Sequence, residues 1–191
     1  GRGIKVVLKE KELKNNFLLA KKEAELSFGS NQVYIEKYLN NPRHIEIQVL
    51  CDNQGNAIHL GERECSIQRR NQKIIEECPS PAISDNERKR ICETTIKAMK
   101  KIGYVNIGTV EYLYSDGNFF FMEMNTRLQV EHTVTEEVYD IDIVKEQINI
   151  SSGKKISLKQ DEIKKKGHSI ECRINAENPI TQLPSTGLIK T

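Results

Sequence analysis

The sequence predicts an α+β domain built on a largely antiparallel sheet with flanking helices. Two observations predict this class. Strand-like segments follow one another through short turns at 44–61 and again at 109–125, and strands joined by short turns pair antiparallel. Segments with apolar residues at helical spacing lie apart from these hairpins, so helices flank the sheet instead of alternating with every strand. In chain order, the expected elements are β-α-β-β-β-α-β-β-α-β.

The first 40 residues are expected to form a strand at 4–8, a helix at 10–26 and a strand at 32–39. A glycine-containing break at 28–31 ends the helix. Apolar side chains recur along one line of this helix, at Leu13, Phe17, Ala20 and Ala24. This spacing indicates one packed face and a polar opposite face.

A hairpin is expected next. Residues 44–50 alternate between apolar and polar side chains, which places Ile45, Ile47 and Val49 on one face of a strand. The polar face carries His44, Glu46 and Gln48. A turn at 52–56 then leads to a returning strand at 57–61.

A helix is expected to begin at the capping box Ser84-x-x-Glu87 and to end at Gly103. Its apolar positions include Ile91, Thr95, Met99 and Ile102. The remaining expected elements are strands at 109–114 and 119–125, a helix at 140–152 closed by Gly153, and a strand at 167–175.

The second hairpin turns at Asp116-Gly117 and permits a prediction about register. A two-residue loop pairs Glu111 with Met122, whereas a loop of three or five residues pairs Glu111 with Glu123. Two opposed carboxylates repel each other, but a divalent cation between them attracts both. We predict the odd-numbered loop.

The length, net charge and cysteine content of the chain limit the classes of protein to which it can belong. The chain has 191 residues, enough for one ordinary domain or parts of two. Its 29 basic and 27 acidic residues give a net charge of +2, which argues against a nucleic-acid partner. No apolar run reaches the length of about 18 residues that crosses a membrane, and no signal peptide is recognised. The five cysteines are odd in number and widely spaced, which favours reduced thiols in a cytosol-like compartment.

The run EMNTRLQVEH carries an unusual set of polar residues. If it is extended throughout, one face holds Glu123, Asn125, Arg127, Gln129 and Glu131. With Glu111, the first two offer the carboxylate and amide oxygens that Mg²⁺ prefers. The pattern alone weighs this metal site evenly against exposed acids on an edge strand.

The other three residues of that face add a guanidinium group that binds planar oxyanions, an amide, and a base. By the pattern alone, a surface salt-bridge ladder is the simpler interpretation of them. His44 and Lys73 are by default solvated side chains, and Gly1-Arg2-Gly3 is a weak signal for a phosphate loop.

Six motifs together resemble one family. They are GRG before a strand, YIEKYLNNPRHIEIQVL, GERECSIQRRNQKIIEE, GTVEYL, FMEMNTRLQVEHTVTE and ECRINAENP. In this order and spacing they resemble biotin carboxylase, an ATP-grasp enzyme, over essentially the whole chain. The resemblance implies carboxylation of carrier-bound biotin by bicarbonate, with MgATP (or Mn²⁺) and carboxyphosphate as the intermediate.

The resemblance also implies roles for individual residues. The implied ATP-binding positions are Gly1, Glu36, Lys37, Tyr38, Leu39, His44, Gln68, Asn71, Glu111 and Glu123. The implied metal ligands are Glu111, Glu123 and Asn125. The implied bicarbonate site comprises Lys73, Arg127, Gln129 and the backbone of Val130. Glu131 is implied as the base, Lys73 and Arg127 as further catalytic residues, and Arg173 as the biotin contact.

The resemblance divides the chain into the remainder of a lid subdomain at 1–38, the main ATP-grasp subdomain at 39–166, and the start of a C-terminal domain at 167–191. The family's amino-terminal domain and most of its glycine-rich loop are missing from the sequence. The piece by itself is therefore expected to bind ATP weakly and to turn over little. Asn71 stands where many members have histidine, and Thr133 replaces a common proline.

The implied partners are a biotin carboxyl carrier protein or domain, a carboxyltransferase, and a second copy in a homodimer. Acetyl-CoA carboxylase in a bacterial cytoplasm is the expected setting, with a mitochondrion or plastid as alternatives; no nucleic acid or membrane is expected. Two rival functions stay open. One is another ligase that activates bicarbonate, of the carbamoyl-phosphate type, and the other is a non-catalytic nucleotide-binding fragment. The run RLQVEH favours biotin carboxylase.

Overall fold

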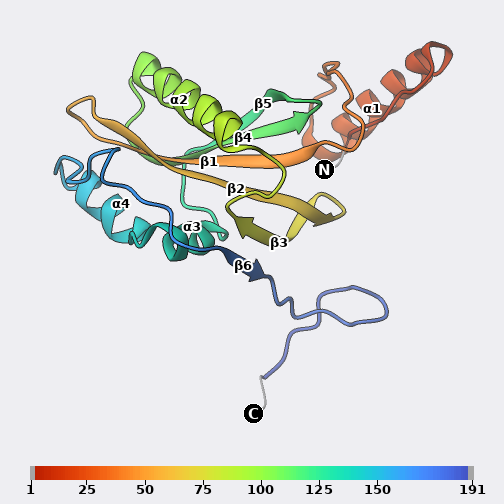
Figure 1. Ribbon diagram of the computed structural model, residues 1–191. Coiled ribbons are helices and arrows are strands. Elements are labelled where there is room, and N and C mark those ends of the chain that lie inside the picture. The colour runs from red at the N-terminus through yellow and green to blue at the C-terminus, as the bar shows by residue number, and fades with distance from the viewer. Residues whose placement is uncertain (1–2, 189–191) are drawn as a thin grey trace. The chain divides into compact units, whose positions relative to one another are not determined.

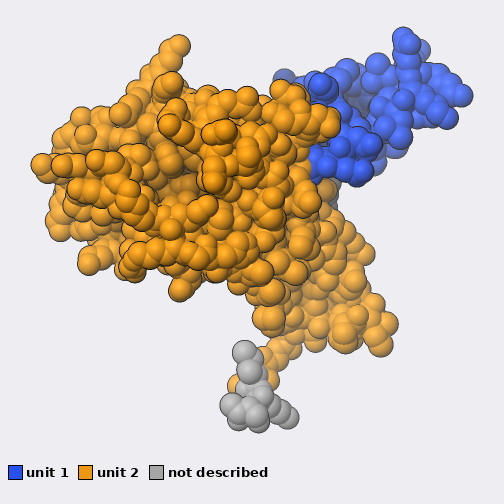
Figure 2. Space-filling model, in the orientation of Figure 1, with its two compact units in different colours: residues 1–42 blue, residues 43–191 orange. Residues whose placement is uncertain are grey.

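The computed structural model describes residues 3–188, which fall into two compact units (Figures 1 and 2). The first unit covers residues 1–42 and the second covers residues 43–191. Each unit is described by itself.

The first unit consists of a short 3₁₀ turn, η1 (Glu10–Glu12), and the expected helix, α1 (Leu13–Phe28). Gly29 ends α1 in the left-handed conformation, with a φ of 68°, and its N–H bonds to the carbonyl of Glu25. The strands expected at 4–8 and 32–39 are wrong, because both segments are irregular. A strand is stable only when a neighbour satisfies its backbone groups, and the described part of this unit offers no such neighbour.

The second unit is built on one six-stranded sheet (Figure 1). Its strands are β1 (Arg43–Cys51), β2 (Ala57–Arg69), β3 (Gln72–Cys78), β4 (Asn106–Ser115), β5 (Asn118–Asn125) and β6 (Ser169–Cys172). Their order across the sheet is β5-β4-β1-β2-β3-β6, and every neighbouring pair is antiparallel. The expected α+β class and antiparallel sheet are confirmed. The final strand is shorter than expected.

Helices cover both faces of the sheet (Figure 1). They are α2 (Asp85–Ile102) on one face, and α3 (His132–Tyr139) and α4 (Ile143–Ser151) on the other. The capping box of α2 is confirmed in both of its hydrogen bonds, and Gly103 ends the helix with a φ of 65°. The helix expected at 140–152 is shortened, because Asp140 turns the chain at a φ of 56° and separates α3 from α4.

The side chains of β1 alternate between the two faces of the sheet, as the sequence predicts. Ile45, Ile47 and Val49 pack in the apolar cluster beneath α2, and Leu50 packs in the cluster beneath α3 and α4. The rest of this second face carries polar side chains, all buried: His44, Glu46 and Gln48. Buried polar groups require partners, so this end of the sheet marks a candidate site.

Strand β2 changes faces at Gly61. Leu60 packs beneath α3 and α4, Glu62 binds Arg88 of α2 on the opposite face, and Arg63 returns to the face of Leu60. The pairing with β1 shifts between Val49 and Ile47, so β2 contains a bulge there. Gly61 has a φ of 61°, and a side chain at this position would lie 1.9 Å from the hydroxyl of Tyr139.

The second hairpin pairs Glu111 with Glu123, as predicted, but by a different route. Ser115 pairs with Asn118, so the loop has two residues and the predicted odd-numbered loop is wrong. A bulge at Met122 supplies the extra residue, because the pairing shifts between Tyr112 and Glu111.

In the described residues, no helix is both long and apolar enough to cross a membrane. All five cysteines are free thiols; Cys172 is exposed and the other four are buried.

Candidate active site

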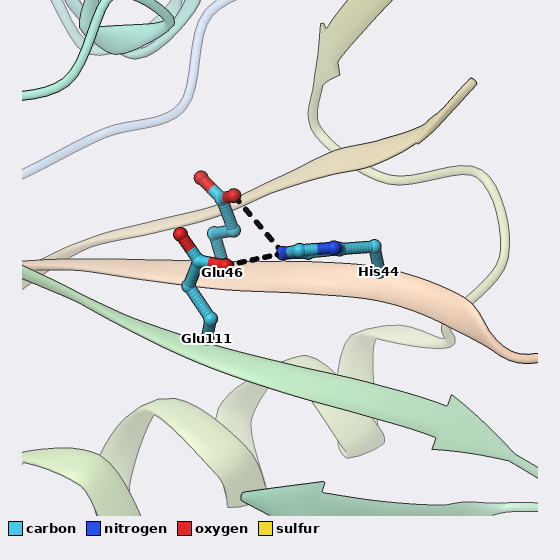
Figure 3. A group of neighbouring side chains, drawn as sticks. All are labelled: His44, Glu46 and Glu111. Atoms are coloured by element: carbon cyan, nitrogen blue, oxygen red, sulfur yellow. Dashed lines mark hydrogen bonds and ion pairs between the residues drawn. The ribbon is translucent and has the colours of Figure 1, made fainter. Parts of the chain in front are cut away.

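Three buried side chains form the centre of the polar face. His44 and Glu46 extend from β1 and Glu111 extends from the neighbouring β4 (Figure 3). The Nε2 atom of His44 lies 2.7 Å from Glu111 Oε2 and 3.1 Å from Glu46 Oε1. Glu46 and Glu111 are cross-strand partners, so two carboxylates meet on one face. Such a pair requires nearby cations.

Lys73 of β3 supplies the main cation. Its Nζ atom donates to Glu46, to Glu111 Oε1 at 2.9 Å and to Glu131 Oε1 at 2.7 Å. Burial opposes the charged form of Lys73, but the charge of Glu46 and the hydrogen bonds to Glu131 and Glu46 help to outweigh it and raise the pKa of the ammonium group above its ordinary value. One ammonium group thus joins β1, β4 and the segment before α3.

Two amides also converge on Glu111. Asn125, at the end of β5, and Gln129, beyond it, each donate from their side-chain nitrogen to Glu111 Oε1 at 2.7 Å. Burial raises the pKa of Glu111, but the hydrogen bond from His44 and the charge of Lys73 outweigh it, so the pKa is lowered overall. Glu111 is therefore held as a carboxylate.

Glu123 lies opposite Glu111 on the same face and is exposed. Its side chain has no hydrogen bond or ion pair with the other described residues, so its carboxylate is available to a ligand. Glu111, Glu123 and the carbonyl oxygen of Asn125 are hard oxygen donors, two of them charged, which fit Mg²⁺ or Mn²⁺. The predicted metal ligands thus share one patch across β4 and β5.

Arg173, just beyond β6, reaches the same cluster. Its Nη2 donates to Glu131 Oε2 at 2.8 Å and its Nε donates to Glu76 Oε1 at 2.7 Å. Glu131 is therefore held between two cations, Lys73 and Arg173. The second oxygen of Glu76 is buried without a partner in the described structure, and burial raises the pKa of this carboxyl group.

The expected alternation through residues 123–131 is wrong beyond Asn125, where β5 ends. Gln129 and Glu131 reach the site through a turn that begins α3, and the N–H of His132 bonds to the carbonyl of Gln129. Arg127 is exposed and donates to Leu128 O and Asn125 Oδ1, each at 3.2 Å, instead of joining Lys73. Val130 is also exposed. Its side chain is apolar, so only its backbone is suited to bind an anion.

Of the other predicted ATP contacts, one lies in the site and the rest lie elsewhere in the chain. Gln68 is in the site, because its Nε2 lies 3.0 Å from His44 Nδ1. Asn71 is exposed in the two-residue turn between β2 and β3, where its φ of 63° suits asparagine. The segment Glu36, Lys37, Tyr38 and Leu39 is irregular and lies in the first unit. Gly1 lies outside the described residues.

Three buried residues of the site were not predicted from the sequence: Glu46, Arg63 and Glu76. Glu46 shares the polar face of β1 with His44, and this alternation was a usable signal. Arg63 gave no such signal, because the bulge at Gly61 reverses which side chains of β2 face the site.

The class of protein follows from a family comparison. Residues 1–159 match the family described as carbamoyl-phosphate synthase L chain, ATP binding domain, and the chain belongs to this family. Among individual relatives, the biotin carboxylase of Pseudomonas aeruginosa is 53% identical over 190 residues, which are 100% of this chain and 42% of that protein. The resemblance to biotin carboxylase is confirmed.

Solved structures agree. The biotin carboxylase–βγ-ATP complex of Campylobacter jejuni has a TM-score of 0.90 and 51% identity, over 96% of this chain and 41% of that chain. The biotin carboxylase domain dimer of Hydrogenobacter thermophilus 2-oxoglutarate carboxylase, in complex with MgADP, ADP and bicarbonate, has a TM-score of 0.89 and 49% identity, over 96% and 41%. The fold is therefore ATP-grasp, and the chain spans about two-fifths of the length of these relatives.

Proposed function

We propose that the complete protein carrying this chain is the biotin carboxylase of a biotin-dependent carboxylase. It would carboxylate biotin on a carrier protein, using ATP, Mg²⁺ or Mn²⁺, and bicarbonate. The observation that carries the proposal is the convergence of Lys73, Gln129 and Glu131 beside the acidic pair Glu111 and Glu123. Donors for an oxyanion and ligands for a metal–nucleotide complex adjoin one another there.

The reaction needs bicarbonate to attack the terminal phosphorus of ATP. A bicarbonate oxygen forms the new P–O bond, ADP leaves, and carboxyphosphate results. We assign Lys73, Arg127, Gln129 and the backbone N–H of Val130 to binding the bicarbonate. Lys73 and Gln129 are already held in the cluster, and donors fixed in advance stabilise developing negative charge without reorganising, which is usually the largest catalytic contribution. Arg127 would turn from its contacts with Leu128 and Asn125 to reach the anion.

Glu131 is assigned as the base that takes the bicarbonate proton. Lys73 and Arg173 each bind one of its oxygens, and each oxygen keeps a second lone pair that can accept a proton. Arg173 is assigned to the biotin side, where it would stabilise negative charge on the ring oxygen. Carboxyphosphate then releases CO₂ and phosphate. The biotin ring nitrogen gives up its proton to this phosphate and forms the new N–C bond to the CO₂.

The metal is assigned to Glu111, Glu123 and Asn125. A bound Mg²⁺ ion would neutralise phosphate charge. His44, Gln68, Asn71 and the segment 36–39 are assigned to the nucleotide. The domain limits at residues 38 and 166 also stay a prediction.

We further propose acetyl-CoA carboxylase as the parent enzyme, with a separate or fused carrier protein, a carboxyltransferase and a homodimeric carboxylase component. A bacterial cytoplasm is the proposed location. One similar structure comes from a 2-oxoglutarate carboxylase, so keto acids are the acceptors to compare with acetyl-CoA. Carboxylation assays with the reconstituted complex test acetyl-CoA, pyruvate and 2-oxoglutarate as acceptors. Carboxylation of pyruvate or 2-oxoglutarate, with none of acetyl-CoA, would reject acetyl-CoA carboxylase as the parent enzyme.

The activity itself is tested by ATP cleavage in the complete protein, with and without free biotin and bicarbonate. Cleavage that requires both is expected, and the Glu131→Gln variant is expected to lose it. Cleavage that needs bicarbonate but ignores biotin would indicate a carbamoyl-phosphate-type ligase instead. Nucleotide binding without cleavage, unchanged in Glu123→Gln and Glu131→Gln, would indicate a non-catalytic module. The 191-residue piece alone is expected to turn over little or nothing.

A further inference from the structure

Arg63 is the most completely buried cation of the site, with 0% of its surface exposed. All of its donor groups are used. Nε donates to Glu46 at 3.0 Å, Nη1 to Gln48 at 2.8 Å and to Thr135 at 3.1 Å, and Nη2 to Thr109 at 2.9 Å and to Gln129 at 3.1 Å. Its partners thus come from β1, β4, α3 and the segment that precedes α3.

Only one of these partners is charged. Arg63 and Glu46 form a buried ion pair, and the other four bonds go to amide and hydroxyl oxygens. A buried ion pair by itself is a poor source of stability, because removing two charges from water costs about as much as their attraction returns. Arg63 therefore requires an explanation other than stability, and its bond to Gln129 offers one.

Gln129 has two chemically different ends. Its Oε1 accepts from Arg63, and its Nε2 donates to Glu111. A guanidinium group only donates, so the oxygen of Gln129 must face Arg63 and the NH₂ group must face the acidic cluster. Gln129 lies outside any strand, in the irregular segment between β5 and α3, so no sheet hydrogen bonds hold its backbone in register.

We propose that Arg63 is a positioning residue, which fixes the amide of Gln129 with its donor end toward the bicarbonate site. This inference rests on the proposed function of Gln129. Arg63 reaches this place only because the bulge at Gly61 turns it to the face of α3. It acts through Gln129 and touches no assigned substrate position. An anion site whose donor is held in advance avoids the cost of ordering that donor on binding.

The test is a double-mutant cycle in the complete protein, with Arg63→Lys and Gln129→Ala. Lysine keeps the charge near Glu46 but cannot hold all five acceptors. We expect Arg63→Lys to raise the KM for bicarbonate about tenfold, because the hydrogen bond from Gln129 to the bicarbonate anion is weakened or lost. The KM for ATP should change less than about threefold. In the Gln129→Ala background, Arg63→Lys should have almost no further effect on the bicarbonate KM.

Arg88→Lys is the matched control. Arg88 also forms an ion pair with a buried glutamate of β2, Glu62, but on the opposite face of the sheet beneath α2. The substitution removes an arginine that is partly buried and paired with a buried glutamate, without touching Gln129, so the bicarbonate KM should stay at the wild-type value. An equal rise in Arg88→Lys would mean that the loss of any arginine paired with a buried glutamate of β2 produces the effect, which overturns the proposal.

Two further outcomes are decisive. An unchanged bicarbonate KM in Arg63→Lys, or an equal rise with and without the Gln129 side chain, overturns the positioning role. If Arg63→Lys does not fold, Thr109→Val replaces it, because it removes the other acceptor of Nη2 and loosens the same group; a rise of about twofold to threefold, absent with Gln129→Ala, is expected. Failure of the proposed function appears separately, as a wild-type protein without bicarbonate-dependent ATP cleavage.

Discussion

Glu111 of β4 pairs directly with Glu123 of β5, and the bulge at Met122 brings them opposite each other. The loop of this hairpin would otherwise place Glu123 on the far face. A like-charged cross-strand pair is unfavourable on its own, and two hard carboxylates at this spacing suit a divalent cation. The relationship therefore leads to a prediction about stability with and without metal.

Replacing Glu123 with glutamine should stabilise the protein in the absence of divalent ions, by about 0.5 kcal/mol, because one of two facing charges is removed. With MgATP present, the wild type should be the more stable of the two, because it binds MgATP and is stabilised by that binding, whereas the variant binds it more weakly. Thermal denaturation with EDTA and with MgATP measures both effects. Glu137→Gln, which removes an exposed acid of α3, is the control and should show neither. A variant that gains as much from MgATP as the wild type would remove Glu123 from the metal site.

Replacing Lys73 with methionine should destabilise the protein by about 3 kcal/mol, because the buried carboxylates of Glu46, Glu111 and Glu131 lose the cation that they share. Urea denaturation measures this loss. The double variant Lys73→Met, Glu46→Gln should recover part of it, since one unpaired carboxylate is then neutral. No recovery would show that Lys73 contributes through its packing and not through its charge.

Stability should depend on pH through His44. Burial lowers the pKa of this histidine, but its hydrogen bonds to Glu111 and Glu46 and their charges outweigh burial and raise the pKa from 6.5 to about 9. A raised pKa in the folded state stabilises the protein fully below pH 6.5, and the contribution is lost as pH rises through about 9.

The measurement is the difference in urea midpoint between the wild type and His44→Gln, from pH 6 to pH 10. The difference should shrink as pH rises across that window. His168→Gln is the control, because the side chain of His168 is more exposed and pairs with Glu77, outside the cluster around His44. A difference that grows with pH would mean that His44 is neutral in the folded protein.

Replacing Gly61 with alanine should cost roughly 3 kcal/mol, from left-handed backbone strain together with overlap with Tyr139. Gly117→Ala is the matched control. Its φ of 75° is similar, but nothing lies within 4 Å of the added carbon, so it should cost only about 1 kcal/mol of strain. Chemical denaturation distinguishes the two. Equal costs would show that the close approach to Tyr139 relaxes freely.

The antiparallel sheet, α1, α2 and both predicted hairpins could be read from the sequence, because alternation, capping residues and turn residues act over a few positions. Ser84 and Glu87 lie three residues apart and bond to each other, so their pattern contains its own partner. The segments 4–8 and 32–39 have strand composition but no strand, since composition does not supply the neighbouring strand that pairing requires.

For the site, the sequence alone indicated which residues are candidates: the polar face of β1, the pair Glu111 and Glu123, and Lys73, Gln129 and Glu131, which the motif resemblance proposes. The tertiary structure alone decided how they meet. The bulges at Gly61 and Met122 each add one residue to a strand, and one residue reverses which face a side chain occupies. Arg63 enters the site and Glu123 faces Glu111 for that reason, because pairing between distant strands fixes a register that local sequence does not contain.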